Sequence, residues 1–368
     1  MDKSLSVSNR IFLTHLLPEE FISKYKVAVA GCNFSFNLLS GNCFSKVYSI
    51  LPTNVGSKID EECYNDNRFE LVYAMWLRQR GRLGIAIASF VEQCRVFSKI
   101  PKDASLWLYN VTDLNLYLII LLWIFKRSVQ INVIVLDFTP NSRRISLANL
   151  YLHIINKMHG LITLSDSYLF KVQNKILLPG VVPSNSGNEP IISQINNRFL
   201  LSGVLSEHIA MTSMVVEAFS QLPQCELHIT GFRQDDDVIK QYAEHYSNIF
   251  YHGRVAFEEY LEILHSCTFQ LSTRDATYPE NQCNFPSKII EALLHNRAIV
   301  STISYRQISD VYYFVVGSQI NEFRDRIAEI VSLSNAELMS YVNQGKKVES
   351  LFNTSIWDRA MSQIEDRK

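Results

Sequence analysis

The sequence predicts an α/β protein made of two Rossmann-like domains that face a central cleft. Segments typical of β-strands alternate with segments typical of helices along the whole chain, which is the pattern of parallel α/β architecture. The pattern stops at a segment rich in Pro, Gly, Ser and Asn over 179–190 and then restarts. A length of 368 residues suits two domains of ordinary size.

In the first half, strands are expected where short apolar runs end in glycine or polar residues. These runs are Lys26–Gly31, Leu106–Tyr109, Ile131–Leu136, Gly160–Leu164 and Lys175–Leu178. Helices are expected over Leu116–Phe125 and Leu147–Met158. Ile131–Leu136 is the clearest strand of this half, and the polar turn that begins at Asp137 closes it.

The second half repeats the alternation. Strands are expected at Arg198–Ser202, Glu226–Gly231, Ile249–Gly253, Phe269–Thr273 and Ala298–Thr302, and helices at Thr212–Leu222, Asp237–His245, Phe257–Ser266 and from Pro286 onward. Helices are also expected to fill most of 321–368. The expected organisation is therefore a first domain over 1–183, a linker over 184–197, a second domain over 198–345, and a final helix over 346–368 that returns to the first domain.

Composition limits the class of protein. The hydrophobic fraction of 47% is enough for two cores. The 35 basic and 36 acidic residues give a net charge of −1, which argues against nucleic acid as a partner. The 7 cysteines have no CxxC spacing and none of the 9 histidines has metal-ligand spacing, so neither a metal nor a cofactor is expected. Scattered cysteines and the lack of a signal-peptide pattern favour a cytoplasmic protein.

The longest apolar run, Leu116–Phe125, is too short to cross a bilayer. A buried helix is the favoured interpretation, and a helix resting on a membrane surface is the alternative. A nearby cluster, Trp76 with Arg78, Arg80 and Arg82, is either a solvated turn or a contact with anionic lipid.

The segment 281–294 is typical of a helix start that binds an anion. Pro286 suits the first turn, and Asn284 and Ser287 have side chains that can satisfy backbone N–H groups there. A phosphate is stabilised at a helix N-terminus, and Lys288 adds a full positive charge. Glu291, one turn further on, lies on the same side as Lys288. The pattern favours a nucleotide, with its diphosphate at the helix start and its ribose hydroxyls on Glu291.

Five stretches of the second half resemble the nucleotide-sugar-binding domain of retaining GT-B glycosyltransferases of family 4, the glycosyltransferase group 1 family. They are Phe199–Glu207, Val215–Phe219, Leu227–Gly231, Tyr251–Val255 and Phe285–Thr302. The resemblance covers Asn197–Asp310 well and the first half only in layout. The tetrad Phe-Pro-Ser-Lys, with an Arg shortly before it, is similar to a subset of the family that acts in bacterial surface-polysaccharide synthesis.

The resemblance implies roles for individual residues. Diphosphate contact is expected from Arg274, Lys288 and the segment of Asn284, Phe285, Pro286 and Ser287, and ribose contact from Glu291. The nucleotide base is expected at Arg254 and Val255. Gly203 and Gly231 end strands, and their lack of a side chain lets a phosphate or sugar approach. Arg274 and Lys288 would stabilise the charge of the leaving diphosphate.

The chain departs from the family pattern at three positions. Cys283 stands where the family has the first carboxylate of its Glu-x7-Glu element, and Glu280 is out of register with it. Val204 and Ile209 stand where the family usually has an Arg and a Lys. Phosphate binding is therefore expected to depend on Lys288 and Arg274.

Candidate residues in the first half follow predicted strands. Asp137 closes the clearest strand and is the candidate catalytic residue there, with a loop-capping Asp as the alternative. Asn110, Thr112 and Asp113 follow the strand before it and have the same ambiguity. Gly31 and the segment Asn37–Gly41 are further candidates for contact with the donor.

The expected activity is retaining, metal-independent transfer of a hexose-type sugar from a nucleotide diphosphate sugar to a glycan or lipid-linked acceptor, in surface-polysaccharide synthesis. Such an acceptor would bring the first domain to the inner face of the membrane. The alternative is a GT-B-like protein that binds a nucleotide or glycan without catalysis. An NAD-dependent dehydrogenase is disfavoured, because no GxGxxG follows a predicted strand.

Overall fold

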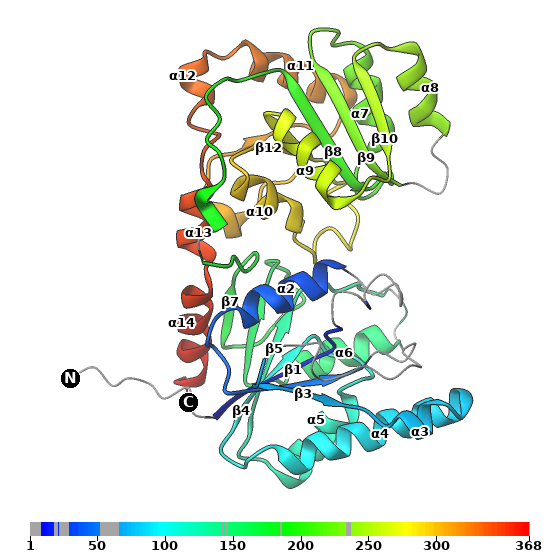
Figure 1. Ribbon diagram of the computed structural model, residues 1–368, viewed down its shortest axis with the longest axis vertical. Helices are drawn as coiled ribbons and strands as arrows, with labels where there is room; N and C mark the ends of the chain where they lie inside the picture. Colours follow the sequence, from blue (N-terminus) through cyan, green and yellow to red (C-terminus); the bar gives the residue numbers. More distant parts are fainter. Residues whose placement is uncertain are drawn as a thin grey trace, which may run out of the picture. The chain divides into compact units, whose positions relative to one another are not determined.

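The structure is a computed structural model, and it describes residues 9–17, 21, 29–51, 66–141, 143, 146–184, 186–232 and 237–367, with only the backbone of 29, 30 and 232. The chain forms two compact units. The first unit contains the residues up to Pro183 together with Phe352–Lys368, and the second contains Ser184–Leu351. Each unit is built around one sheet (Figure 1).

The first unit has a seven-stranded sheet in the order β3-β2-β1-β4-β5-β6-β7. The strands are β1 (Arg10–Thr14), β2 (Lys46–Ile50), β3 (Phe69–Val72), β4 (Ser105–Tyr109), β5 (Gln130–Val135), β6 (Gly160–Thr163) and β7 (Lys175–Leu177). All neighbouring strands are parallel. The strand order reverses between β1 and β4, and in doubly wound sheets ligands bind beyond the carboxyl ends of the strands at such a point.

Helices cover both faces of this sheet, as in doubly wound folds. They are α2 (Val29–Leu39), α3 (Met75–Arg78), α4 (Gly81–Lys99), α5 (Leu116–Phe125), α6 (Leu147–Ile155) and α14 (Thr354–Glu365). α14 packs beside α2, whereas α4 and α5 pack against each other on the other face (Figure 1). Within the described residues, no helix is long and apolar enough to cross a membrane.

A strand was expected at Lys26–Gly31, but Val29–Gly31 forms the start of helix α2, so the prediction is wrong for these residues. The other residues of that segment lie outside the described ones. The following residues Phe34, Leu38 and Leu39 are buried at helical spacing, and this stripe outweighs the short β-like run before it. The first strand is instead Arg10–Thr14, which is buried at all five positions.

The second unit has a six-stranded parallel sheet in the order β10-β9-β8-β11-β12-β13. Its strands are β8 (Arg198–Val204), β9 (Glu226–Phe232), β10 (Ile249–Gly253), β11 (Phe269–Ser272), β12 (Ala298–Ser301) and β13 (Phe314–Val315). The helices between them are α7 (Thr212–Ser220), α8 (Asp237–His245), α9 (Phe257–Ser266) and α10 (Ser287–Leu294). α11 (Ile320–Ser332), α12 (Asn335–Leu338) and α13 (Gly345–Phe352) follow β13. The strand order reverses between β8 and β11.

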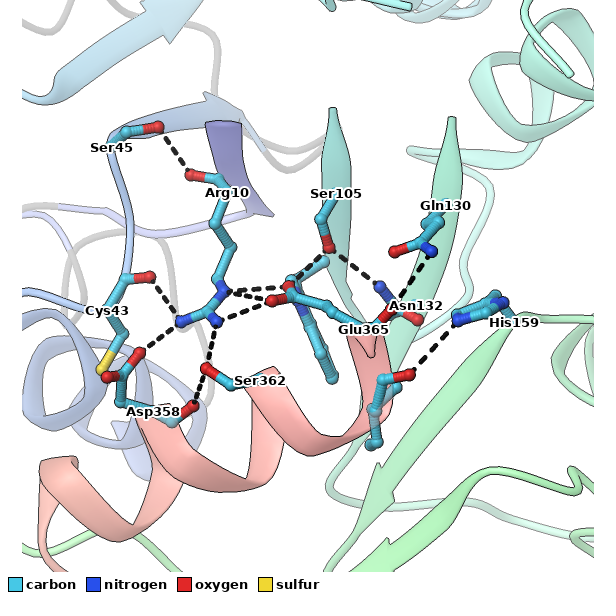
Figure 2. Close-up of polar contacts among 12 residues, drawn as sticks. Arg10, Cys43, Ser45, Ser105, Gln130, Asn132, His159, Asp358, Ser362 and Glu365 are labelled. Carbon is cyan, nitrogen blue, oxygen red and sulfur yellow. Dashed lines mark hydrogen bonds and ion pairs between the residues drawn. The ribbon is translucent and has the colours of Figure 1, made fainter. Parts of the chain in front are cut away.

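The C-terminal helix α14 is joined to the first sheet by the guanidinium of Arg10, which is only 7% exposed (Figure 2). Its Nε and Nη2 donate to the Glu365 carboxylate at 2.9 and 2.7 Å, and its Nη1 pairs with Asp358 and donates to the carbonyl of Cys43 at 3.0 Å. Glu365 also accepts from the indole N–H of Trp107 in β4, at 2.7 Å. Helix α14 is therefore part of the first unit's core and not a loose tail.

Candidate functional site

Two glycines lie side by side at the carboxyl edge of the second sheet. Gly203 of β8 pairs with Gly231 of β9, at φ of +112° and +133°. A Cβ on Gly231 would lie 1.9 Å from the carbonyl oxygen of Gly203, so no other residue fits there. Both strands continue beyond the expected ends, β8 by two residues to Val204 and β9 by one to Phe232, because the parallel pairing continues through the glycines.

Lys288, in the first turn of α10, lies against Gly203. A Cβ on Gly203 would lie 2.8 Å from Cε of Lys288. The Lys288 ammonium also lies 4.9 Å from the centre of the Tyr260 ring. Burial lowers the pKa of Lys288, and the nearby charge of Glu291 only partly opposes this. Among the described residues, Lys288 has no salt bridge, so its charge is held in place without a carboxylate in contact.

Tyr260 of α9 completes this group, although the sequence did not indicate it. Its hydroxyl donates to Oε2 of Glu291 at 3.2 Å. Burial, together with the charge of Glu291, raises the pKa of Tyr260, so the phenol remains a donor. Tyr260 and Leu264 share the buried side of α9, a pattern that predicts an inward position but not the contact with Glu291.

The residues that precede α10 are mostly buried. Asn284, Phe285 and Pro286 are buried and Ser287 is exposed. Pro286 is the N-cap residue, one position before the expected one, and it provides no side-chain hydrogen bond to the helix start. The first N–H groups of a helix have no partner within the helix, so this end offers donors and a positive dipole end beside Lys288.

Arg274 follows β11, the strand on the other side of the point where the strand order reverses. Its backbone N–H donates to Oγ1 of Thr302 at 2.7 Å, and its Nη1 donates to Oδ1 of Asn281 at 3.3 Å. The Asn281 amide in turn donates to the carbonyl of His208 at 2.6 Å. The loops that follow β8 and β11 are thus joined, with the half-buried Arg274 between β11 and α10.

The remaining candidates of the second unit have less specific surroundings. Arg254 is exposed and Val255 half-buried, directly after the outer strand β10. Cys283 is buried at 2% exposure. Val204 is 50% exposed at the end of β8, and Ile209 is half-buried in the loop after it.

In the first unit, Asp137 is exposed two residues after the end of β5. Its charge, together with burial as the larger cause, raises the pKa of Tyr109 at the end of β4. Gly31 lies close to the same tyrosine, since a Cβ there would meet the Tyr109 oxygen at 2.2 Å. Asp137, Tyr109 and Gly31 therefore lie at one edge of the first sheet.

Sequence reasoning missed a histidine that contacts the loop after β4. Nδ1 of His15, which follows β1, donates to the carbonyl of Ile50 at 3.1 Å, and its Nε2 is 3.3 Å from the Thr112 hydroxyl. Burial lowers the pKa of His15 to about 4, although Asp113 opposes this, so the imidazole is neutral at pH 7.

Two other first-unit candidates have structural roles. Asn110 has a φ of 53°, and its Oδ1 accepts the N–H of Leu136 at 3.0 Å, so it joins the ends of β4 and β5. The segment Asn37–Gly41 is at the far end of α2 from Gly31, where a Cβ on Gly41 would lie 2.6 Å from Cβ of Thr354. This segment packs against the start of α14.

No family model matches this chain, and no curated protein matches its sequence. Solved structures do match it in fold. The N-terminal domain of trehalose-6-phosphate phosphatase from Candida albicans has a TM-score of 0.69 at 12% identity, over 99% of this chain and 98% of that one. HepE from Anabaena in complex with UDP has a TM-score of 0.65 at 13% identity, over 98% and 100%.

A third match is the trehalose 6-phosphate synthase of Burkholderia multivorans, with a TM-score of 0.63 at 10% identity, over 97% of this chain and 96% of that one. At such identities the likeness concerns the fold alone. It extends over nearly the whole chain and agrees with the two parallel sheets. The α/β prediction is therefore confirmed, and the chain has the GT-B fold.

Proposed function

We propose that the protein is a glycosyltransferase that moves a sugar from a nucleotide diphosphate sugar to a glycan or lipid-linked acceptor, with retention of the anomeric configuration. The main support is Lys288, a half-buried cation at a helix start whose pKa is lowered by burial and which has no salt bridge among the described residues. A diphosphate would provide the missing anion, and it would also be stabilised by the N-terminal end of α10.

The arrangement around Lys288 suits the other parts of a donor nucleotide. The Tyr260 hydroxyl donates to Oε2 of Glu291 and orients the carboxylate, whose Oε1 is proposed to accept from the ribose hydroxyls. Gly203 and Gly231 let the sheet edge pack closely, with Lys288 against Gly203, and the diphosphate is proposed to bind beside this edge. Arg254 and Val255 are proposed to contact the base. That HepE was crystallised with UDP, and also with UDP-glucose, supports a nucleoside diphosphate sugar as donor.

Catalysis is proposed to depend on stabilising the leaving group. When the bond from the anomeric carbon to the diphosphate breaks, negative charge grows on the diphosphate. Lys288, Arg274 and the N-terminus of α10 would stabilise that charge more strongly in the transition state than in the ground state. Asp137 is the proposed first-unit residue at the sugar or acceptor. No step in this scheme uses a metal or a cofactor.

A surface on the first unit supports a peripheral membrane position. Exposed apolar side chains lie at helical spacing on α4 and α5, and Phe90 and Tyr117 join the two helices with ring centres 5.4 Å apart. We name this the α4–α5 surface; it comprises Leu83, Ile87, Phe90, Tyr117, Ile120 and Ile124. The exposed Arg80 and Arg82 lie beside it. Such a surface suits the interface of an anionic membrane.

Arg78 does not belong to that cationic group. It is buried, and its guanidinium donates to Glu92 at 2.6 Å and to the carbonyl of Leu51 at 2.9 Å. Arg78 therefore has a structural role, and the lipid contact suggested by the sequence is limited to Trp76, Arg80 and Arg82.

Turnover with a panel of nucleotide sugars and oligosaccharide or lipid-linked acceptors tests the activity. We expect acceptor-dependent release of a nucleoside diphosphate, with a product whose anomeric configuration matches the donor's. Glu291→Gln should lower kcat/KM by about tenfold or more, because a carboxylate hydrogen bond to the ribose contributes about 1.5–3 kcal/mol.

The matched control is Glu258→Gln, an exposed carboxylate in the first turn of α9, the helix that contains Tyr260. It should leave kcat/KM unchanged. Nucleotide binding without turnover on any acceptor of the panel would favour the non-catalytic alternative.

A further inference from the structure

Three potential metal ligands from separate segments of the second unit meet away from Lys288. Glu189 follows the short helix at Ser186–Asn188, His265 is in the last turn of α9, and His295 is the C-cap residue of α10. Nε2 of His265 is 2.9 Å from Nδ1 of His295, and Oε2 of Glu189 is 3.7 and 3.4 Å from these two nitrogens. One ligand atom of each side chain thus lies within 4.8 Å of the other two.

These separations fit a tetrahedral metal site. Ligand atoms at about 2.0–2.1 Å from a zinc ion in tetrahedral geometry lie about 3.3 Å from one another. The observed distances of 2.9, 3.4 and 3.7 Å bracket that value. Two imidazole nitrogens and one carboxylate are ligands that Zn²⁺ accepts.

The backbone that presents the three ligands is fixed by the two residues that follow His295. Arg297 is buried, and it donates to the carbonyls of His295 and His265 at 2.7 and 3.1 Å. Asn296, also buried, donates to the carbonyl of Glu189 at 2.9 Å. Both histidine segments and the glutamate segment are therefore held in place by neighbouring side chains, which lowers the cost of arranging them around an ion.

The site remains open on one side. The side chains of His265 and Glu189 are 37% and 35% exposed, and that of His295 is 16% exposed. Solvent can therefore reach the centre, and a water can take a fourth coordination position.

We propose that Glu189, His265 and His295 bind one divalent metal ion of the zinc class, with water as the fourth ligand. The ion joins the segment that enters the second unit to the C-terminal ends of α9 and α10. The sequence predicted no metal site, because 30 residues separate the two histidines and this separation is not a recognised spacing of metal ligands. The site does not depend on the proposed activity, since Lys288 is at the other end of α10.

A second pair of histidines in the same unit provides an internal comparison. Nδ1 of His228 is 3.1 Å from Nε2 of His252, while Glu226 lies 3.4 Å from the opposite nitrogen of His228. One ion cannot bind all three of these side chains, because His228 would have to present both ring nitrogens to it. The pair of His228 and His252 therefore has two neighbouring imidazoles, as in the proposed site, but no carboxylate on the same side as the two facing nitrogens.

The test is calorimetric titration of chelator-treated, tag-free protein with Zn²⁺. We expect one equivalent to bind per chain, and His265→Ala and His295→Ala each to weaken this binding at least tenfold. His228→Ala should bind Zn²⁺ as the wild type does. Wild-type binding no tighter than that of His265→Ala, or an equal loss in His228→Ala, would overturn the proposal.

A spectroscopic measurement on the unchanged protein avoids dependence on how well the variants fold. Co²⁺ added to the wild type should give the intense visible absorption of a tetrahedral ion, and Zn²⁺ should displace it. Glu189→Gln, which preserves size, should reduce that absorption. If Co²⁺ gave only the weak spectrum of a hydrated ion, the two imidazoles would simply hydrogen-bond to each other and the proposal would be wrong.

Discussion

Lys288 combines two features that are unfavourable in the unliganded protein. A cation in the first turn of a helix opposes the helix dipole, and burial against Tyr260 removes water from the ammonium. A bound diphosphate would relieve both, which supports the proposal that Lys288 binds an anion. The sequence predicted the lysine and its helix, but not the aromatic ring, because Tyr260 lies on another helix.

His15 gives a pH dependence to the first unit. Its folded pKa of about 4 is below the ordinary value of 6.5, so the unfolded chain binds the proton more tightly. The stability that the neutral imidazole contributes is complete above pH 6.5 and is lost as the pH falls toward 4.

We predict that lowering the pH from about 7 to about 5 decreases the free energy of unfolding of the wild type by roughly 1–2 kcal/mol more than that of His15→Gln. Urea unfolding followed by tryptophan fluorescence measures this, because Trp76, Trp107, Trp123 and Trp357 all lie in the first unit. Identical pH dependence in both proteins would show that His15 is not held neutral.

At the scale of elements, α14 depends on one buried arginine. Arg10→Ala would leave Glu365, only 18% exposed, with its charge unpaired. We predict a loss of about 3–5 kcal/mol in the free energy of unfolding, measured by the same fluorescence method. Arg326→Ala breaks an exposed ion pair with Glu329 and should cost at most about 1 kcal/mol. Similar losses in the two variants would mean that Arg10 does not fix α14.

The α4–α5 surface makes a separate prediction at this scale. Ile120→Glu with Ile124→Glu should reduce cosedimentation with vesicles that contain anionic lipid, and added salt should weaken wild-type binding. Ile191→Glu, which changes an exposed apolar residue of the second unit, should have no effect. Wild-type protein that stays in the supernatant with anionic vesicles would contradict the proposed membrane position.

Elements also show what the sequence can and cannot predict. α8, α9 and β10 have the predicted bounds, because amphipathic spacing and the flanking polar residues are local signals. The strand prediction for Lys26–Gly31 was wrong at its described residues, Val29–Gly31. Their composition is strand-like, whereas the buried stripe typical of a helix comes later in α2. Helix starts were predicted to within one residue at α10, where Pro286 is the N-cap.

At the scale of the whole molecule, the two-sheet plan could be predicted, because the alternation of strand and helix patterns and the break near 179–190 are visible in the sequence. The glycines and Lys288 could also be identified, since a strand-end glycine and a helix-start lysine are local patterns. Tyr260, His15 and the group of Glu189, His265 and His295 could not, because each depends on side chains that come together only when distant segments fold.

The central claim is that Lys288 binds the diphosphate of a nucleotide. Calorimetric titration with UDP, GDP and ADP tests it on the wild type, Lys288→Met and Lys347→Met. Lys347 is a close control, because it also lies in the first turn of a helix, with its ammonium 4.9 Å from the ring centre of Tyr312.

At least one of the three nucleotides should bind to the wild type and to Lys347→Met with equal affinity. Lys288→Met should bind it about 10- to 100-fold more weakly, because a charged hydrogen bond to the diphosphate contributes about 1.5–3 kcal/mol. Without ligand, Lys288→Met should unfold at a temperature no lower than that of the wild type. Equal affinity in Lys288→Met, or no binding of any nucleotide to the wild type, would contradict the account.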